Sequence, residues 1–137
     1  MSGVLLDTNV VSETVQPEPD QRVLAFLADR DELWLSTMVL HELEFGVQIL
    51  PYGRRRDRIA AAVRSMAAHH AGRILPIGIE EAEHAASLRA RARQSGLVLD
   101  LGDALIAATA AVNNLAIATR NTKDFEGLDR EVVNPWS

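Results

Sequence analysis

The sequence is most informative at Val4-Leu5-Leu6-Asp7-Thr8-Asn9, where a short apolar run with β character stops at an acid followed by two turn-prone polar residues. This pattern predicts a buried strand that ends in a carboxylate. Ligands of open α/β sheets bind beyond the carboxyl ends of the strands, so Asp7 is a candidate site residue by position as well as by chemistry. A second interpretation, that Asp7 caps the next helix, stays open from this segment alone.

Short strand-like runs alternate with longer helical segments along the whole chain. We expect helices from a cap at Asp20 to about Ala28, from a cap at Ser36 or Thr37 to about Leu50, and over 54–70, 80–94 and 101–112. The alternation predicts the α/β class, with a largely parallel sheet and helices on both faces. The expected strands are Val4–Leu6, Leu33–Leu35, Ile74–Ile77, Ala116–Ala118 and Val132–Val133.

Length and composition indicate one domain over residues 1–137, because 137 residues with 47% hydrophobic content suffice for one substantial core. The chain has no cysteine, which excludes thiolate zinc sites and thiol nucleophiles and fits a reducing compartment. The apolar run Val4–Leu6 is too short for a signal peptide, and no segment approaches the roughly 20 apolar residues of a membrane helix. We therefore expect a soluble, cytoplasmic protein.

The net charge of -5 argues against a general nucleic-acid coat protein, which needs a broad basic surface. It does not exclude a nuclease with an acidic, metal-loaded site. Arginines cluster at 54–58 and 89–93. These clusters are either solvated helix faces or phosphate-contacting patches that flank an acidic cleft.

A second candidate acid, Glu42, lies in the helix expected after Ser36. Helical spacing places Glu42 on the same face as an apolar row of Met38, Phe45 and Ile49. An acid on a buried face must be paired, protonated or bound to something. The neighbouring His41 does not indicate a zinc protease, because that motif needs a second histidine where this chain has Phe45.

Two more acids follow later in the chain. Asp103 lies in the first turn of the segment 101–112, which is apolar nearly all round and therefore predicts a buried central helix. Complementarity to the helix dipole is the alternative explanation for Asp103, and Asp100 is expected in the preceding loop. Asp124 lies in a polar loop after the strand 116–118, where an ordinary turn is the alternative.

Four segments together resemble the PIN-domain family, and within it the VapC-type toxin ribonucleases of the FitB-like branch. No single motif is specific, but their order and spacing match the family over nearly the whole chain. The segments are Leu6-Asp7-Thr8-Asn9, the Ser36 to Glu42 stretch, Asp103-Ala104-Leu105-Ile106-Ala107-Ala108 and Thr119-x-Asn121-x-x-Asp124-Phe125.

The resemblance implies a PIN-like α/β/α sandwich around a parallel sheet of four or five strands. It also implies a Mg²⁺- or Mn²⁺-dependent endoribonuclease that is the toxin of a toxin–antitoxin system, forms a homodimer and is neutralised by a cognate antitoxin protein. By position, the family's acidic quartet corresponds to Asp7, Glu42, Asp103 and Asp124, and its supporting polar residues correspond to Asn9, Thr119 and Asn121.

The chemistry of such a quartet favours a divalent metal. Two carboxylates about 4 Å apart repel by roughly 4 kcal/mol at an effective dielectric constant near 20, so the group needs protons or cations. Mg²⁺ prefers oxygen ligands and retains water. We expect Asp7 and Asp103 to be the principal ligands, with Glu42 and Asp124 completing the site, orienting the water that attacks RNA or holding a second ion.

Other enzyme classes fit less well. A haloacid dehalogenase-type phosphatase needs a second Asp where this chain has Asn9, and a receiver domain needs adjacent acids after its first strand. The four histidines show no acid–base arrangement, and His69 and His70 are expected to be exposed at a helix end. The alternative from another class is a non-catalytic PIN-like module that binds RNA or a partner protein. The RNA target is not encoded in any of these motifs.

Overall fold

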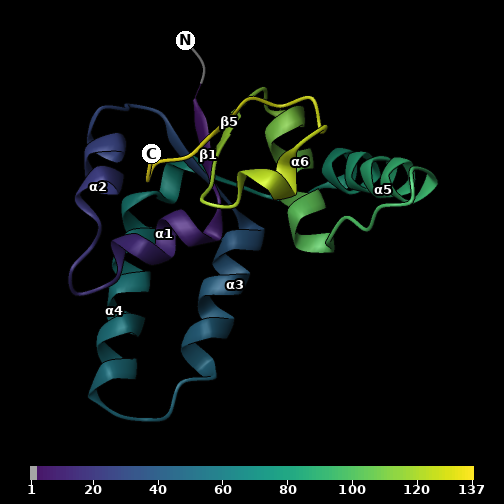
Figure 1. Cartoon of the computed structure of the whole chain (residues 1–137). Coiled ribbons are helices and arrows are strands. Elements are labelled where there is room, and N and C mark those ends of the chain that lie inside the picture. Colours follow the sequence, from purple (N-terminus) through teal and green to yellow (C-terminus); the bar gives the residue numbers. More distant parts are fainter. Residues whose placement is uncertain (1–2) are drawn as a thin grey trace.

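The computed structural model describes residues 3–137, and its five strands form one parallel sheet with the order β3-β2-β1-β4-β5 (Figure 1). The central strand β1 pairs through Val4 with Leu33 on one side and with Ala116 on the other. The predicted parallel sheet is confirmed, with five strands. Their bounds are β1 Val4–Leu6, β2 Leu33–Ser36, β3 Ile74–Leu75, β4 Ala116–Ala118 and β5 Val132–Val133.

The helices surround this small sheet in the expected α/β/α arrangement. Helices α3 and α4 form a long hairpin that projects away from the sheet, and α5 extends on the other side, where it packs against α6 (Figure 1). The helices are α1 Thr8–Thr14, α2 Gln21–Ala28, α3 Thr37–Gln48, α4 Arg54–His69, α5 Ile79–Gln94 and α6 Leu101–Val112, with short 3₁₀ helices η1 Ala71–Arg73 and η2 Thr122–Phe125.

Side-chain caps set the starts of several helices. Asp20 accepts a hydrogen bond from the Arg22 amide at 2.8 Å, and Ser36 accepts one from the Val39 amide at 3.3 Å. Both caps were predicted, because such oxygens satisfy amides that lack a partner inside the helix. Asp100 is itself the cap of α6, accepting from the Gly102 amide at 3.0 Å, so it belongs to the helix boundary and not merely to the loop before it.

The prediction of which face of α3 is buried was wrong. The buried residues are Val39, Leu43 and Val47, whereas the side chains of Phe45 and Ile49 are 59% and 66% exposed. Residues four positions apart share a helix face, so α3 carries two apolar stripes, and only the stripe of Val39 faces the core. Phe45 and Ile49 lie toward the end of the hairpin, where no other part of residues 3–137 covers them.

The remaining differences from the expected elements are small. Strand β3 ends at Leu75, two residues earlier than expected, because Pro76 has no amide to continue the ladder. Helices α3 and α4 each end at or within two residues of the expected position, at Gln48 and His69. Helix α1 was not predicted as an element, and it begins directly after Asp7.

The core lies between the sheet and these helices. Its largest fully buried side chains are Phe125, Leu5, Leu35, Ile106 and Ile117. Helix α6 is buried along much of its length, as its apolar sequence predicted. No helix within residues 3–137 is long and apolar enough to cross a membrane.

Candidate active site

The four acids of the quartet lie near the carboxyl edge of the sheet. Three are on elements that follow β1, β2 and β4, and one is at the start of α6, which leads into β4. Asp7 directly follows β1, and Glu42 lies on α3, which begins where β2 ends. Asp103 is in the first turn of α6, and Asp124 is in η2, which follows β4. Since all strands are parallel, their carboxyl ends meet at one edge, where ligands of such sheets bind.

Asp7 is the most buried acid, with 6% of its surface exposed. Its Oδ1 accepts a hydrogen bond from the Thr8 amide at 2.8 Å, and its Oδ2 accepts one from the Thr119 hydroxyl at 2.7 Å. Asp7 therefore caps α1, which confirms the second interpretation from the sequence, and it also lines the cleft as a candidate site residue. Burial raises the pKa of Asp7 above its usual value, the charges of Glu42 and Asp124 add to this, and the two hydrogen bonds lower it.

Glu42 is fixed by a hydrogen bond that its sequence context did not predict. The Thr8 hydroxyl donates to Glu42 Oε1 across the space between α1 and α3. Since Thr8 also contributes its amide to Asp7, this one residue orients two carboxylates.

Asp103 is half-buried, and its pKa is strongly raised. Burial raises its pKa to about 7, and the charges of Asp124, Asp7, Asp100 and Glu42 contribute further. Mutual repulsion of this kind requires the carboxylates to be close. Asp124 is the most exposed of the quartet, and its amide donates to the Asn121 carbonyl at 3.0 Å.

The three predicted supporting residues differ in what they do. Asn9 Nδ2 donates to Asp7 Oδ2 at 3.2 Å, and the buried Thr119 hydroxyl donates to the same oxygen. Asn121 uses its backbone amide to donate to Thr119 Oγ1 at 3.1 Å, and its side chain lines the cleft. Asn9 and Thr119 thus hold Asp7 directly, whereas Asn121 acts through Thr119.

A cleft of about 470 Å³ opens over these groups. Asp124 lies in an adjoining hollow of about 330 Å³ that shares Asp103 with the cleft. The cleft is lined by Asp7, Thr8, Asn9, Ser12, Glu13, Gln16, Glu42, Asp103, Arg120, Asn121 and Trp136.

Several cleft residues were not predicted as site residues, among them Thr8, Arg120 and Trp136. Thr8 stands next to Asp7 inside the quoted motif, and that adjacency was the available signal. Arg120 likewise stands between Thr119 and Asn121. Trp136 has no local signal, because only the folded chain brings the C-terminal segment to the cleft.

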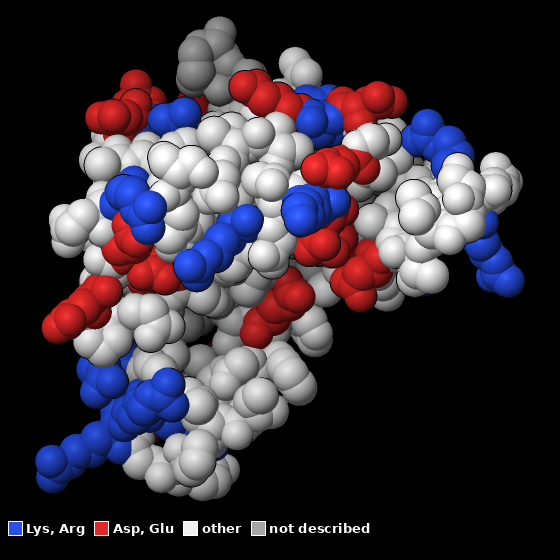
Figure 2. All heavy atoms as spheres, viewed as in Figure 1, with Lys and Arg blue, Asp and Glu red and all other residues white. Residues whose placement is uncertain are grey.

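The arginines at the start of α4 are not part of the cleft lining. Figure 2 shows Lys and Arg side chains gathered at the far end of the α3–α4 hairpin, away from the sheet. Arg56 stacks over the Tyr52 ring at 4.2 Å and donates to the Leu50 carbonyl at 3.2 Å. Of the two histidines expected to be exposed, His69 is, and His70 is partly buried with its ring on the Met66 carbonyl.

Comparisons with known proteins agree with this arrangement. The PIN domain family profile matches residues 4–131. The chain is 38% identical to the VapC ribonuclease Y4jK of Sinorhizobium fredii, with 97% of each chain covered. It is also 38% identical to the toxin FitB of Neisseria gonorrhoeae, covering 97% of this chain and 98% of that one.

The fold is similar to that of solved members as well. The crystal structure of FitAcB from Neisseria gonorrhoeae superposes with a TM-score of 0.89 at 38% identity, covering 97% of this chain and 98% of that chain. A VapBC2 complex from Rickettsia felis bound to promoter DNA gives a TM-score of 0.78 at 24% identity, covering 96% and 97%. The family profile matches most of the sequence, the relatives match over nearly their full length, and the acids lie together at one edge of the sheet. We conclude that the chain belongs to the PIN domain family.

Proposed function

We propose that this protein is a metal-dependent endoribonuclease and the toxin of a toxin–antitoxin pair. The observation that carries the proposal is the convergence of four acids from distant parts of the sequence on one sheet edge, close enough for Asp103 to be affected by the other three. Stability alone does not require such a costly group. Its full-length relatives include a VapC ribonuclease and a toxin.

The acids fit a Mg²⁺ or Mn²⁺ ion by the chemistry of their donors. All four supply carboxylate oxygens, which both ions prefer. Burial raises the pKa values of Asp7 and Asp103, the neighbouring acids raise them further, and a bound cation would offset both effects. Within residues 3–137 no group of three or more acids or histidines is arranged closely enough to hold a metal ion by itself. Mg²⁺ generally keeps several waters and binds through one or two carboxylates.

Each residue then has a distinct role. Asp7 and Asp103 are the principal metal ligands, and Glu42 and Asp124 complete the site or orient the attacking water. Asn9 and Thr119 hold the Asp7 carboxylate in one orientation, Thr8 does the same for Glu42, and Asn121 supports Thr119. When bound, the metal would supply an activated water and neutralise the charge that develops as the RNA phosphodiester is hydrolysed.

The partners follow from the relatives. Two relatives at 25% and 24% identity are named tRNA(fMet)-specific endonucleases, which supports an RNA substrate for this chain. The FitAcB and VapBC2 structures are of toxin–antitoxin systems, and we propose that a cognate antitoxin binds this chain too. A homodimer and a cytoplasmic location complete the proposal.

The decisive experiment is cleavage of a mixed cellular RNA pool by purified protein with Mg²⁺, with Mn²⁺ and with EDTA. We expect cleavage with either metal, none with EDTA, and none in the Asp7→Asn and Asp103→Asn variants. Asp31→Asn is the matched control, because it removes the same charge from an exposed loop, and it should cleave normally. Cleavage that survives EDTA or either site substitution would refute the proposal, and RNA binding without cleavage would point to the non-catalytic module.

A further inference from the structure

Arg120 is a basic side chain in the lining of an otherwise acidic and polar cleft. It directly follows the buried Thr119, and its backbone amide donates to Asn9 Oδ1 at 3.1 Å. Its backbone is thereby tied to the same asparagine that holds Asp7. The side chain starts from a fixed point beside the carboxylates.

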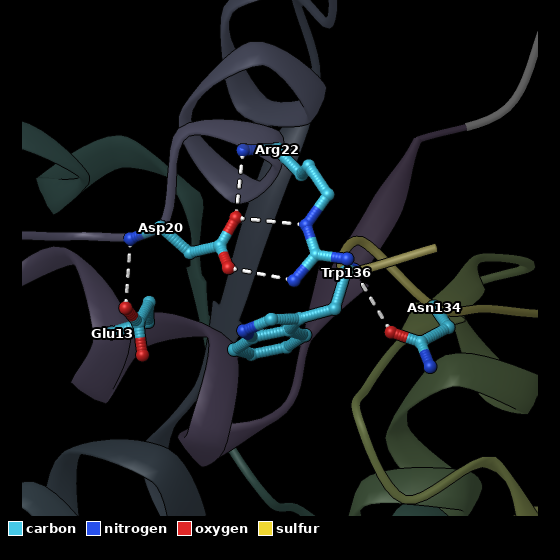
Figure 3. Close-up of polar contacts among 5 residues, drawn as sticks. All are labelled: Glu13, Asp20, Arg22, Asn134 and Trp136. Carbon is cyan, nitrogen blue, oxygen red and sulfur yellow. Dashed lines mark hydrogen bonds and ion pairs between the residues drawn. The ribbon is translucent and has the colours of Figure 1, made fainter.

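The Arg120 guanidinium is supported by an aromatic ring. Its Cζ lies 4.9 Å from the centre of the Trp136 ring, within the range of a cation–π interaction. Trp136 is only 7% exposed, and its amide donates to Asn134 Oδ1 at 2.9 Å (Figure 3). Nearby, the Asp20 amide donates to Glu13 Oε2 at 2.8 Å and links helix α1 to the start of α2 (Figure 3). The ring is therefore a firm support for the guanidinium.

The donors of this guanidinium are unused within the described part of the chain. Among residues 3–137 the salt bridge is that between Arg22 and Asp20, so Arg120 forms none. The Arg120 guanidinium also donates no hydrogen bond to another described residue, since the bond to Asn9 uses the backbone amide. Other arginines are committed: Arg73 donates to the Leu33 carbonyl and Arg130 to the Leu115 carbonyl. Arg120 thus lines a cleft with four acidic residues, Asp7, Glu13, Glu42 and Asp103, and forms no ion pair with any of them.

A planar cation with free donors suits a phosphate, which it can hold with two parallel hydrogen bonds. An acidic cleft repels the phosphate backbone of a nucleic acid, and a cation in its lining would reduce this repulsion by neutralising a phosphate. We propose that Arg120 binds a backbone phosphate of the RNA as it enters the cleft, and that Trp136 is the positioning residue that holds the guanidinium there. The identity of this substrate rests on the proposed function.

The test is binding of a short fluorescein-labelled single-stranded RNA of mixed sequence, measured by anisotropy in EDTA over a series of salt concentrations. We expect Arg120→Ala to bind roughly tenfold more weakly. The slope of log affinity against log salt should become shallower by roughly 0.7, the value for one phosphate contact on a single strand. Arg120→Lys should keep the wild-type salt slope and recover part of the affinity lost in Arg120→Ala. Lysine supplies the positive charge but not the two parallel hydrogen bonds of a guanidinium.

Arg30→Ala is the matched control. The Arg30 guanidinium also stacks on an aromatic ring, 3.8 Å from the centre of Phe26, but Arg30 does not line the cleft. The Arg30→Ala variant should bind RNA like the wild type. Trp136→Phe keeps a ring under Arg120 and should bind nearly normally, whereas Trp136→Leu, checked for folding by circular dichroism, should weaken binding as Arg120→Ala does.

An Arg120→Ala variant with wild-type affinity and salt slope would overturn the inference, as would an equal loss in Arg30→Ala. A lower melting temperature with unchanged RNA binding would show that Arg120 only tethers the C-terminal segment. Because this assay needs no cleavage, its outcome is separate from that of the nuclease test. Cleavage with normal KM in Arg120→Ala would leave the proposed function standing and remove this inference alone.

Discussion

Thr8 connects two carboxylates through two different atoms, its amide to Asp7 and its hydroxyl to Glu42. Replacing its hydroxyl by a methyl group in Thr8→Val would leave Glu42 free to rotate. We expect a loss of cleavage rate of roughly tenfold to a hundredfold, the value of one hydrogen bond to a charged group. Thr8→Ser should keep most of the activity.

The control for Thr8→Val lies on the same helix. The Thr14 hydroxyl donates to the Val11 carbonyl and does not line the cleft, so Thr14→Val should cleave RNA at the wild-type rate. If Thr8→Val and Thr14→Val were equally active, Thr8 would have no part in orienting Glu42.

Asp103 makes the stability of the metal-free protein depend on pH. Its pKa rises from 3.8 to about 7 on folding, chiefly through burial and then through the neighbouring acids. Between these values the folded state binds more protons than the unfolded state, so the free energy of unfolding falls as the pH rises from about 4 to about 7.

Asp103→Asn should remove this dependence. In EDTA at pH 8 we expect the variant to be more stable than the wild type by about 1 kcal/mol, since partial exposure screens much of the interaction. At pH 4 the two should be equally stable in urea unfolding. Asp31 is exposed and remote from the site, so Asp31→Asn should show the wild-type dependence of the free energy of unfolding on pH. If Asp103→Asn showed that same dependence, Asp103 would not titrate as described.

Among the elements, helix α6 depends on its cap. Asp100 Oδ2 accepts from the amides of Gly102 and Asp103, which fixes the turn that carries Asp103. Asp100→Ala should lower the free energy of unfolding by about 1 kcal/mol, whereas Asp100→Asn keeps a good cap and should lower it far less. Both variants lose the same charge, so a difference between them in urea unfolding isolates the cap, and equal stabilities would contradict it.

Local chemistry made most elements predictable. Strand β1 and helix α6 were evident because their burial leaves continuous apolar sequence, and Pro51 and the caps at Asp20 and Ser36 mark real boundaries. The buried face of α3 was not predictable, because its sequence has two apolar stripes and only tertiary packing selects the stripe that contains Val39. Helix α1 is short and has no long periodic pattern to reveal it.

The site was predictable to the same extent. Asp7 follows a strand, Asp103 opens a helix and Asp124 lies in the segment after a strand, which are positions that a sequence can indicate. Glu42 lies inside α3 and has no such marker. The contacts of Thr8 with Glu42 and of Arg120 with Trp136 join segments far apart in the sequence, so no local pattern records them.

Across the whole molecule, the connection between α5 and α6 presents a surface suited to self-association. Leu97, Val98 and Leu101 are 66%, 98% and 52% exposed, and apolar groups gathered in this way mark interfaces. We expect the wild type to sediment as a homodimer and Val98→Glu to shift it toward the monomer. Tyr52→Glu changes another highly exposed residue, at the far end of the α3–α4 hairpin, and this variant should remain dimeric. A dimer unaffected by Val98→Glu would place the interface elsewhere.

The hydrogen bond from Thr119 to Asp7 spans 112 positions of the sequence, and the first strand of the chain is flanked by the fourth. During translation, Asp7 therefore leaves the ribosome long before the residues that hold it and the partner acid Asp124. A chain that stops before Thr119 and Asp124 cannot form the contacts that hold Asp7 in the complete site. Assembly of the site thus depends on residues from early and late parts of the sequence.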